Sequence, residues 1–250
     1  MITFSRLEKY GRLGNQMFQI SAVISHAINN GLEYGFKEWK YNSYLLNTLP
    51  LFKGNILCEH REKSAFEFTP APNRDNMDFN GYFQNELYFE NNRESLIKIF
   101  RINPNIENSV YSFTSQWKTD KTTAIHVRRG DYLNLSQYHP VIPIDYYRKS
   151  VEKLDDETEK YVIFSDDIEW CKNNFGFIKD PCYHHTDDEF IDMIVMSKCY
   201  NHIIANSSFS WWGSYLSETN GKCIAPSNWL GPAYSNTNYS GIYRKKMMII

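Results

Sequence analysis

Thr122-Thr123-Ala124-Ile125-His126-Val127-Arg128-Arg129-Gly130-Asp131-Tyr132 is the stretch that decides the fold of this chain. Its first part is apolar and β-branched, which is typical of a short buried strand, and it ends in two arginines and a glycine. Ligands of open α/β sheets bind just beyond the carboxyl ends of the strands. Arginine grips phosphate through a planar fork of donors, so the pattern predicts an anion site. The alternative is an arginine pair that neutralises an acidic surface patch.

Strands and helices alternate on the C-terminal side of this stretch. We expect further strands at 161–165, 202–205 and 222–225, and helices at 144–154, 168–174, 187–198 and 209–216. Such alternation predicts a doubly wound parallel sheet with right-handed crossovers. Three strand ends then share one edge, and they carry His126 with Arg128 and Arg129, Asp166 with Asp167, and Asn206 with Ser207 and Ser208.

That edge has the chemistry of a nucleoside diphosphate site. Its arginines, its hydroxyls and a following helix N-terminus suit phosphate, and a carboxylate suits a base or a ribose. Asp167 could select guanine by accepting hydrogen bonds from ring and exocyclic N–H groups. An aspartate after a strand is also a common helix N-cap, so both roles of Asp167 stay open.

The N-terminal part gives one clear signal, the glycine-rich turn Gly11-Arg12-Leu13-Gly14-Asn15-Gln16-Met17-Phe18. Apolar residues at helical spacing follow it, and Gly31 is a plausible helix end. A helix N-terminus favours an anion, although glycine before a helix is common in any fold. Residues 2–4 could form a first strand and 94–100 a helix. The rest of 32–110 reads as loop with short strands.

Composition excludes several classes of protein. The chain has 250 residues and a net charge of -2, so no global basic field draws it to nucleic acid. Its five cysteines form no CxxC pair, and no apolar run is long enough for a signal or a membrane span, so we expect a cytoplasmic protein. Lys245-Lys246 before the apolar C-terminus could touch an anionic membrane, or the segment could be a final strand.

Four motifs resemble the inverting α-1,2-fucosyltransferases that use GDP-fucose, which form glycosyltransferase family 11. These are the turn from Gly11 to Gln19, the stretch 126–132, Phe164-Ser165-Asp166-Asp167, and Asn206-Ser207-Ser208-Phe209-Ser210-Trp211-Trp212-Gly213. The resemblance covers nearly the whole chain. It implies an α/β fold of the GT-B kind, with two Rossmann-like domains facing across a cleft. The N-terminal domain, 1–118, would be reduced and shape the acceptor side, and the domain 119–250 would bind GDP-fucose.

The resemblance also implies roles for single residues. Arg128 would bind the phosphates of the donor, His126 would lie near guanine, and Asp167 would read the guanine edge. Asn15, beside Gly14, would reach toward the pyrophosphate or the fucose. The phosphate turn would consist of Ser207, Ser208, Phe209 and Ser210, and the residues expected to serve catalysis are Arg128, Asn15 and Asp131.

The reaction implied is transfer of L-fucose from GDP-β-L-fucose to the 2-hydroxyl of a galactose-terminated glycan, with inversion. We expect no cofactor and no metal, because the chain has no D-x-D motif and an arginine with a helix N-terminus can neutralise the leaving GDP. A lipid-linked acceptor would bring the enzyme to the membrane periphery. The general base stays open among Asp131, His139 and Glu86, and Asp131 is favoured instead as a partner that orients Arg128 or Arg129.

Other features have plainer interpretations. Trp211 and Trp212 are expected to pack behind the phosphate turn, and His184-His185 to be solvated loop histidines, since no metal-ligand partner stands at usual spacing. A kinase or sulfotransferase would need a GxxxxGK[ST] loop, which is absent. The remaining alternatives are a fucosyltransferase of other regiochemistry and a non-catalytic glycan-binding or adhesion domain that uses Arg129-Gly130-Asp131.

Overall fold

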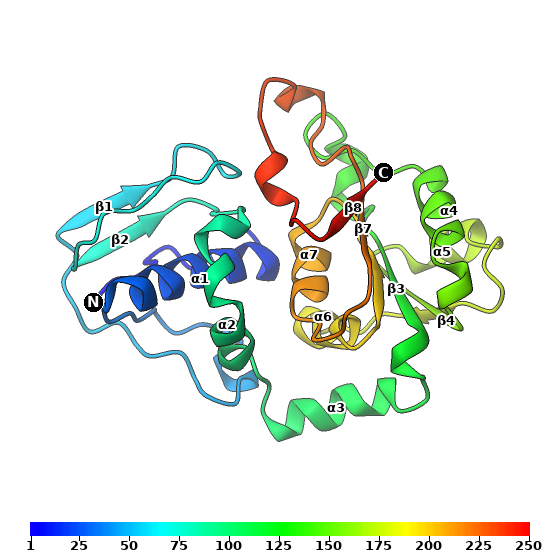
Figure 1. The fold of residues 1–250 in the computed structure, drawn as a ribbon, viewed down its shortest axis with the longest axis horizontal. Coiled ribbons are helices and arrows are strands. Elements are labelled where there is room, and N and C mark those ends of the chain that lie inside the picture. Colours follow the sequence, from blue (N-terminus) through cyan, green and yellow to red (C-terminus); the bar gives the residue numbers. More distant parts are fainter. The chain divides into compact units, whose positions relative to one another are not determined.

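A computed structural model describes residues 1–250, which form two compact units (Figure 1). The first unit contains Met1–Glu107 and Asn238–Arg244, and the second contains Asn108–Thr237 and Lys245–Ile250. The division falls inside helix α3, Pro104–Thr114, and so precedes the one expected at 118/119. A short C-terminal segment also returns to the first unit, which a division into two continuous domains does not foresee.

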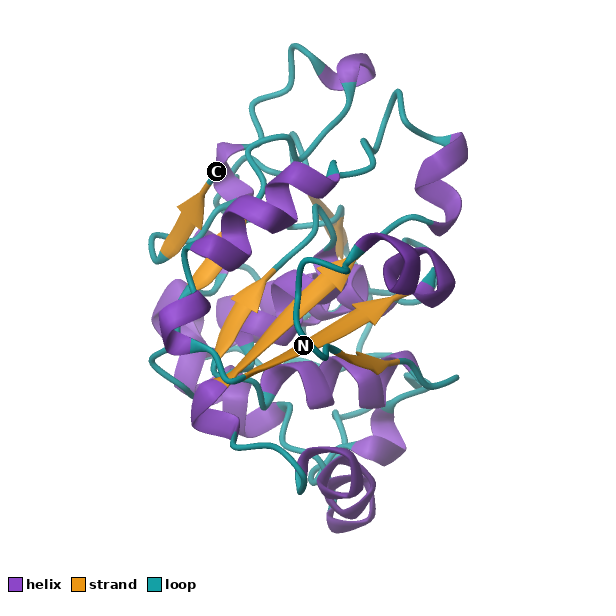
Figure 2. Cartoon of the chain, turned by 90° about the vertical axis from the view of Figure 1, so that its right-hand side faces the viewer, coloured by secondary structure: helices purple, strands orange, loops and turns teal.

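The second unit is built on a six-stranded parallel sheet, whose strands run side by side in Figure 2. Its strands are β3 (Thr122–Val127), β4 (Lys160–Ser165), β5 (Cys182–His184), β6 (Asn201–Ile203), β7 (Cys223–Ala225) and β8 (Met247–Ile249). They pair in the order β5-β4-β3-β6-β7-β8. This is the order of a doubly wound nucleotide-binding sheet, as the alternating pattern predicts.

Four helices cover the two faces of this sheet. Figure 1 shows α4 and α5 on one side and α6 and α7 on the other. Their bounds are Ile144–Glu152, Ile168–Asn174, Glu189–Ser197 and Ser208–Tyr215, each within two residues or so of the expected range. Strand β5 was not expected from the sequence. The final strand β8 pairs in parallel with β7, which confirms the strand interpretation of the C-terminal segment.

Both faces of the sheet bury large side chains. One core cluster joins strand residues such as Ile125 and Ile163 to Tyr147 and Phe175, which are all fully buried. On the α7 side, Trp211 and Trp212 have no exposed surface, as does Tyr215, whose ring stacks on Trp211 with centroids 5.1 Å apart. The predicted packing role of the two tryptophans is confirmed. Burial of this size holds the strand ends in place, because a well-packed interior resists deformation.

The first unit has a smaller sheet. Strands β1 (Cys58–Arg61) and β2 (Met77–Asn80) pair in parallel, and single parallel bridges link Thr3 to Asp78 and Ile2 to Tyr34. Helix α1, Leu13–Asn30, ends at Gly31, which takes the left-handed conformation with φ 63°. Helix α2 spans Arg93–Ile99. The N-terminal α/β unit is therefore reduced, as expected.

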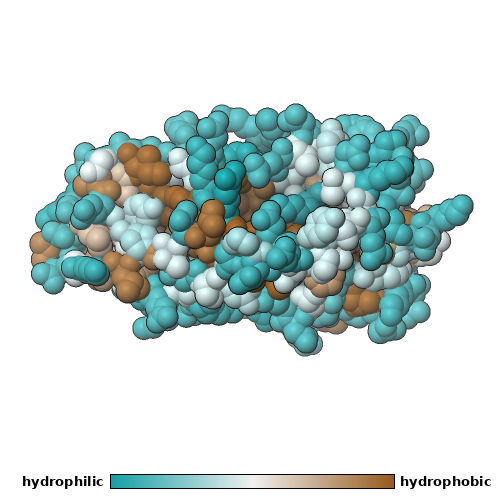
Figure 3. Space-filling model, turned by 90° about the horizontal axis from the view of Figure 1, so that it is seen from below, coloured by the Kyte–Doolittle hydropathy of each residue, from teal (hydrophilic) through white to brown (hydrophobic).

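The face drawn in Figure 3 is mainly hydrophilic, and its hydrophobic patches are small and separate. None of the helices combines the length and the apolar character that crossing a membrane requires.

Candidate functional site

The chain reverses direction across the sheet between β3 and β6. From β3 it proceeds outward through β4 to β5, and from β6 it proceeds the other way through β7. In such sheets, ligands bind in the crevice at the carboxyl ends of the two strands that flank this switch point. Arg128 and Arg129 follow β3, and the segment 206–208 follows β6. The fold thus brings two of the expected motifs to one switch point.

Arg128 is held between two carboxylates. Its Nη1 lies 2.7 Å from Oδ2 of Asp166, its Nη2 donates to Oδ1 of Asp131, and 17% of the side chain is exposed. Charge-assisted bonds on both terminal nitrogens fix the plane of the guanidinium. The remaining N–H donors of Arg128 are left for a ligand. Asp131 thereby takes the orienting position that the sequence favours for it.

Gly130 makes room for this arrangement. A Cβ at position 130 would lie 2.5 Å from Oδ2 of Asp166, which is the atom that contacts Arg128. Any side chain there would push the carboxylate away. The glycine after the arginine pair therefore serves the approach of Asp166.

Arg129 turns toward the end of β4 instead. Its Nε donates to Oδ2 of Asp167 at 3.0 Å, and its guanidinium lies 3.9 Å from the ring centroid of Trp170. Oδ1 of Asp167 accepts from the backbone N–H of Trp170 at 3.1 Å, so Asp167 is the N-cap of α5. Of its two open roles, the cap is thus present in the structure, while reading of guanine stays a prediction.

The charges at this edge nearly balance. Two guanidiniums face three carboxylates, those of Asp131, Asp166 and Asp167. The alternative interpretation of the arginine pair, neutralisation of an acidic surface, is therefore realised in part, because each arginine pairs with aspartate. An anion that binds here would be recognised by oriented N–H donors and a helix N-terminus, since net positive charge is not available.

His126 lies at the end of β3 as a buried, neutral ring. It is 6% exposed, and its ring centroid is 5.1 Å from that of Phe209. Burial, reinforced by the nearby Arg128 charge, lowers the pKa of His126 to about 3. Its Nδ1 is buried without a hydrogen-bond partner. A neutral ring with an unused nitrogen can donate a hydrogen bond to a nucleobase, or accept one from it, without adding charge.

The N-terminus of α7 closes the other side of the switch point. Oγ of Ser207 caps the helix by accepting from the N–H of Phe209 at 3.3 Å. Ser208 and Phe209 are partly exposed, but Ser210 is fully buried and its hydroxyl faces the carbonyls of Ala205 and Ser207. The hydroxyl of Ser210 therefore points into the protein, and any phosphate contact in this turn is left to the other residues and to main-chain N–H groups.

The loop after Gly130 is hydrogen-bonded to Asn206, which precedes the N-terminus of α7. Tyr132 donates from its hydroxyl to the carbonyl of Asn206 at 3.1 Å, and its ring stacks on His139 with centroids 4.9 Å apart. Asn206 donates in turn to the carbonyls of Pro140 at 3.0 Å and Trp229 at 3.1 Å. Burial lowers the pKa of His139, against the opposing charge of Asp131. His139 is thus chemically able to accept a proton, and it stays a candidate base.

In the first unit, Asn15 lies in the first turn of α1. Its Oδ1 accepts from Nε2 of Gln84 at 2.6 Å, and the preceding Gly14 is buried. Glu86, the third candidate base, begins a 3₁₀ turn, Glu86–Tyr88. The roles of these residues toward a donor or an acceptor remain predictions.

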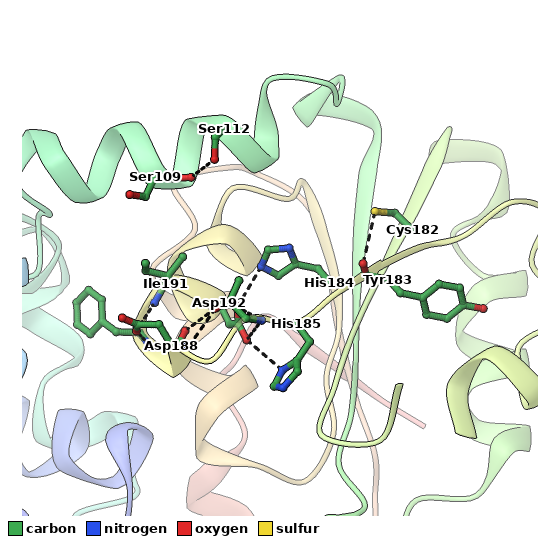
Figure 4. A network of polar contacts seen from close by, with 11 residues as sticks. Ser109, Ser112, Cys182, Tyr183, His184, His185, Asp188, Ile191 and Asp192 are labelled. Carbon is green, nitrogen blue, oxygen red and sulfur yellow. Dashed lines mark hydrogen bonds and ion pairs between the residues drawn. The ribbon is translucent and has the colours of Figure 1, made fainter. Parts of the chain in front are cut away.

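Of the two adjacent histidines, only His185 lies where the sequence predicts. His184 ends β5, is 6% exposed, and lies 3.1 Å from Oδ1 of Asp192 (Figure 4). Its ring also meets Phe113 edge-on, with centroids 4.7 Å apart. The expectation of a solvated loop histidine is therefore wrong for His184, because the unforeseen strand β5 carries it inside. It holds for His185, whose side chain is 53% exposed.

Asp192 is the centre of this second network. Burial would raise its pKa, but contacts from His184 and Thr186 outweigh burial and lower the pKa of Asp192. Oγ1 of Thr186 donates to it at 2.7 Å. The charge of Asp192 also acts on His126, where it opposes the effects of burial and Arg128. No group of three or more histidine, cysteine, aspartate or glutamate residues is arranged to hold a metal ion.

Three residues of the site were not assigned from the sequence: Asp166, Tyr132 and Trp170. Asp166 could have been found, because it precedes Asp167 at a strand end that was expected to face Arg128. Tyr132 closes the arginine motif, but nothing in the pattern says that its hydroxyl reaches Asn206. Trp170 carries no signal, since its contact with Arg129 depends on how α5 leaves the sheet.

Comparison with known proteins agrees with this geometry. The family model described as Glycosyl transferase family 11 matches residues 3–249. The chain belongs to glycosyltransferase family 11. The family and the enzyme class indicated by the four motifs are thereby confirmed.

Two relatives from Escherichia coli show different degrees of coverage. The O-antigen biosynthesis glycosyltransferase WbnK is 36% identical over 59% of this chain, and the match spans only 53% of WbnK. An alpha-1,2-colitosyltransferase is 30% identical over 88% of this chain and 90% of its own length. The human galactoside alpha-(1,2)-fucosyltransferase 1 is 22% identical, with 82% of this chain and 63% of that protein covered.

Solved structures confirm the fold. NodZ, an alpha-1,6-fucosyltransferase soaked with GDP-fucose, has a TM-score of 0.58 at 11% identity, over 86% of this chain and 91% of NodZ. POFUT1 in complex with GDP-fucose has a TM-score of 0.55 at 13% identity, over 89% and 95%. Identities this low establish the GT-B fold class and leave the substrate to be argued separately.

Proposed function

We propose that this protein transfers L-fucose from GDP-β-L-fucose to the 2-hydroxyl of a terminal galactose, inverting the anomeric carbon. The observation that carries the proposal is Arg128, fixed by Asp166 and Asp131 at the switch point of a doubly wound sheet and next to the N-terminus of α7. The α-1,2 regiochemistry is supported by the names of two relatives, and the galactose acceptor by the name of the human one alone.

The chemistry needs a stabilised leaving group. The acceptor oxygen forms a bond to the anomeric carbon, the bond from that carbon to the phosphate oxygen breaks, and GDP leaves with the electron pair. Negative charge then grows on the diphosphate, where the free N–H donors of Arg128 and the amides at the start of α7 would meet it. Asp131 holds Arg128 in that position, and the proton of the acceptor passes to a base.

The direct test is incubation with GDP-fucose and a panel of β-galactosides, followed by linkage analysis of the product. We expect an α-1,2-fucosyl galactoside, formed at the same rate with and without a chelator. Arg128→Lys should lower the rate by about 10²–10³, because a lysine loses the fork that two carboxylates now orient. An α-1,3 or α-1,6 product would overturn the regiochemistry, and no product would leave a glycan-binding role.

A second donor follows from one specific observation. The relative that this chain matches over nine-tenths of its length is an alpha-1,2-colitosyltransferase. GDP-colitose is therefore the competing donor, and equimolar GDP-fucose and GDP-colitose offered with one acceptor separate the two. A product mixture dominated by colitose would move the proposal to that sugar and keep the site.

A further inference from the structure

Two segments of the second unit carry no charged side chain. Aspartate, glutamate, lysine and arginine are absent from 132–144 and from 223–237, although they make up 22% of the whole chain. The exposed positions in these segments carry chiefly amides, hydroxyls and apolar groups. His139 does not change this, because burial lowers its pKa and so keeps the ring neutral near pH 7. A ligand of these segments is therefore recognised without ion pairs.

The two segments are held together through their main chains. The N–H of Gly231 donates to the carbonyl of Tyr138, and the N–H of Ala233 donates to the carbonyl of Gln137, both at 2.9 Å. A Cβ at position 231 would lie 2.4 Å from the carbonyl oxygen of Gln137, so this close approach requires glycine. Figure 1 draws both segments near the top of the view, in green and orange-red. They therefore form one continuous surface.

Two tyrosine rings on this surface are open to solvent. Tyr138 is 48% exposed and Tyr234 is 39% exposed, and their rings meet edge to face with centroids 5.8 Å apart. Each follows a tight turn, since the N–H of Tyr138 donates to Leu135 at 2.8 Å and that of Tyr234 to Gly231 at 2.9 Å. We call Tyr138 and Tyr234 the tyrosine platform. Because the turns fix the backbone, a ligand that packs on the two rings has little conformational entropy to overcome.

The tyrosine platform adjoins the switch point of the same unit. Asn206, which precedes helix α7, donates to the carbonyl of Pro140 in one segment and to that of Trp229 in the other. The first segment begins at Tyr132, whose ring centroid lies 5.3 Å from the guanidinium carbon of Arg128. Both segments are thus attached to the residues that surround the proposed reaction centre.

We propose that the tyrosine platform binds the acceptor glycan, through an uncharged sugar next to the terminal galactose. This inference rests on the proposed function, in which the acceptor is a galactose-terminated glycan. A neutral sugar has C–H groups that pack on aromatic rings and hydroxyls that bond to amides and to other hydroxyls. It carries no charge, and the two segments carry none. A membrane surface would instead call for lysines or arginines at this place.

Acceptor length separates the platform from the reaction centre. The acceptors to compare are methyl β-galactoside and a neutral tetrasaccharide that ends in β-galactose. In the double variant of Tyr138→Ala and Tyr234→Ala, we expect the KM for the tetrasaccharide to rise about 10-fold, because truncation removes an aromatic contact. The KM for methyl β-galactoside, the KM for the donor and kcat should not change. The double variant of Tyr138→Phe and Tyr234→Phe keeps both rings and should retain the wild-type KM for the tetrasaccharide.

Tyr111 offers a matched control in the same unit. It lies on helix α3 and is 68% exposed, so it is a tyrosine that is more open to solvent than either ring of the platform. Tyr111→Ala should leave the KM for both acceptors unchanged. Equal KM values for the tetrasaccharide in the wild type and in the double alanine variant would overturn the proposal. An equal rise in KM for both acceptors would also overturn it, because the rings would then contact galactose itself.

The platform can also be observed without any transfer. Saturation-transfer NMR is recorded with the tetrasaccharide and GDP, and without a sugar donor. Saturation should reach the sugar next to galactose in the wild type and in the double phenylalanine variant, and it should be lost in the double alanine variant. If this pattern appears but the wild type transfers no fucose from GDP-fucose, the proposed function fails and the platform stands. If fucose is transferred but the double alanine variant shows the wild-type saturation, the platform is refuted and the proposed function stands.

Discussion

Replacing His126 should remove a large acid-dependent loss of stability. Burial and Arg128 lower the pKa of His126 from 6.5 to about 3. The unfolded chain therefore binds a proton in a pH range where the folded chain does not. For a basic group whose pKa is lowered by folding, the free energy of unfolding is highest above the pKa that the group has in the unfolded chain. It decreases as the pH falls from 6.5 toward the folded-state pKa of about 3.

The size of the effect at pH 5 follows from these two values. At pH 5 the imidazole of the unfolded chain is almost fully protonated, whereas that of the folded chain is neutral. The free energy of unfolding is therefore about 2 kcal/mol lower at pH 5 than at pH 7.5. This figure is insensitive to the folded pKa as long as that value stays below about 4. It is a large part of the ~5–15 kcal/mol that stabilises a typical protein.

Urea unfolding at pH 7.5 and pH 5 measures the effect, followed by tryptophan fluorescence. Five of the six tryptophans lie in the second unit with His126. The wild type should lose about 2 kcal/mol more between the two pH values than His126→Asn, because the asparagine does not titrate. Taking the difference cancels the other histidines.

The reasoning is refuted if wild type and His126→Asn lose the same stability between pH 7.5 and pH 5. A ¹³C-histidine titration gives a second reading that does not depend on how stable the variant is. The His126 resonance should stay at its neutral position down to pH 5. A midpoint near 6.5 would mean that the ring is solvated and that its burial beside Arg128 is wrong.

Three further changes test the site and its supports. Gly130→Ala places a Cβ against the carboxylate of Asp166 and so disturbs the orientation of Arg128. The KM for the donor should rise about 10-fold with little change in Tm. An unchanged KM would contradict this reasoning. Asp188 caps α6 by accepting from the N–H groups of Phe190 at 2.9 Å and Ile191 at 3.2 Å. Asp188→Ala should therefore lower the free energy of unfolding in urea by about 1 kcal/mol, and Asp188→Asn should lower it clearly less. Equal losses for the two variants would argue against the cap. Trp170→Phe should lower the free energy of unfolding by about 0.5–1 kcal/mol, because it weakens the cation–π contact with Arg129. In a double-mutant cycle, this loss should vanish in the Arg129→Leu background.

Much of the second unit could be predicted from its sequence. Strands β3 and β4 are buried along nearly their whole length, helix α4 buries one face, and polar residues follow β3, β4 and β6. Local patterns of this kind determine the elements, and the rules of doubly wound sheets then fix which strand ends meet. For that reason the sequence predicts that Arg128 and Ser207 lie at the same edge of the sheet.

The features that escaped prediction depend on tertiary contacts. Strand β5 has only three residues, and its His184 is polar, so no local signal marks it as buried. The segment 238–244 joins the first unit across a long separation in sequence. The sequence leaves two roles open for Asp167, because a helix N-cap and a residue that recognises guanine would both be an aspartate at the end of β4. The bond from Gln84 to Asn15 links positions 69 residues apart, which no pattern in a single sequence reveals.

Calorimetric titration of GDP into the protein in the presence of a chelator tests the central claim most directly. If Arg128, oriented by Asp131 and Asp166, and the N-terminus of α7 hold the diphosphate, wild type should bind GDP without divalent cations. Arg128→Lys should then weaken binding about 10–100-fold, the worth of a charge-assisted hydrogen bond, while Arg148→Lys on helix α4 should bind like wild type. Equal affinity of wild type and Arg128→Lys, or loss of wild-type binding on chelation, would contradict the account.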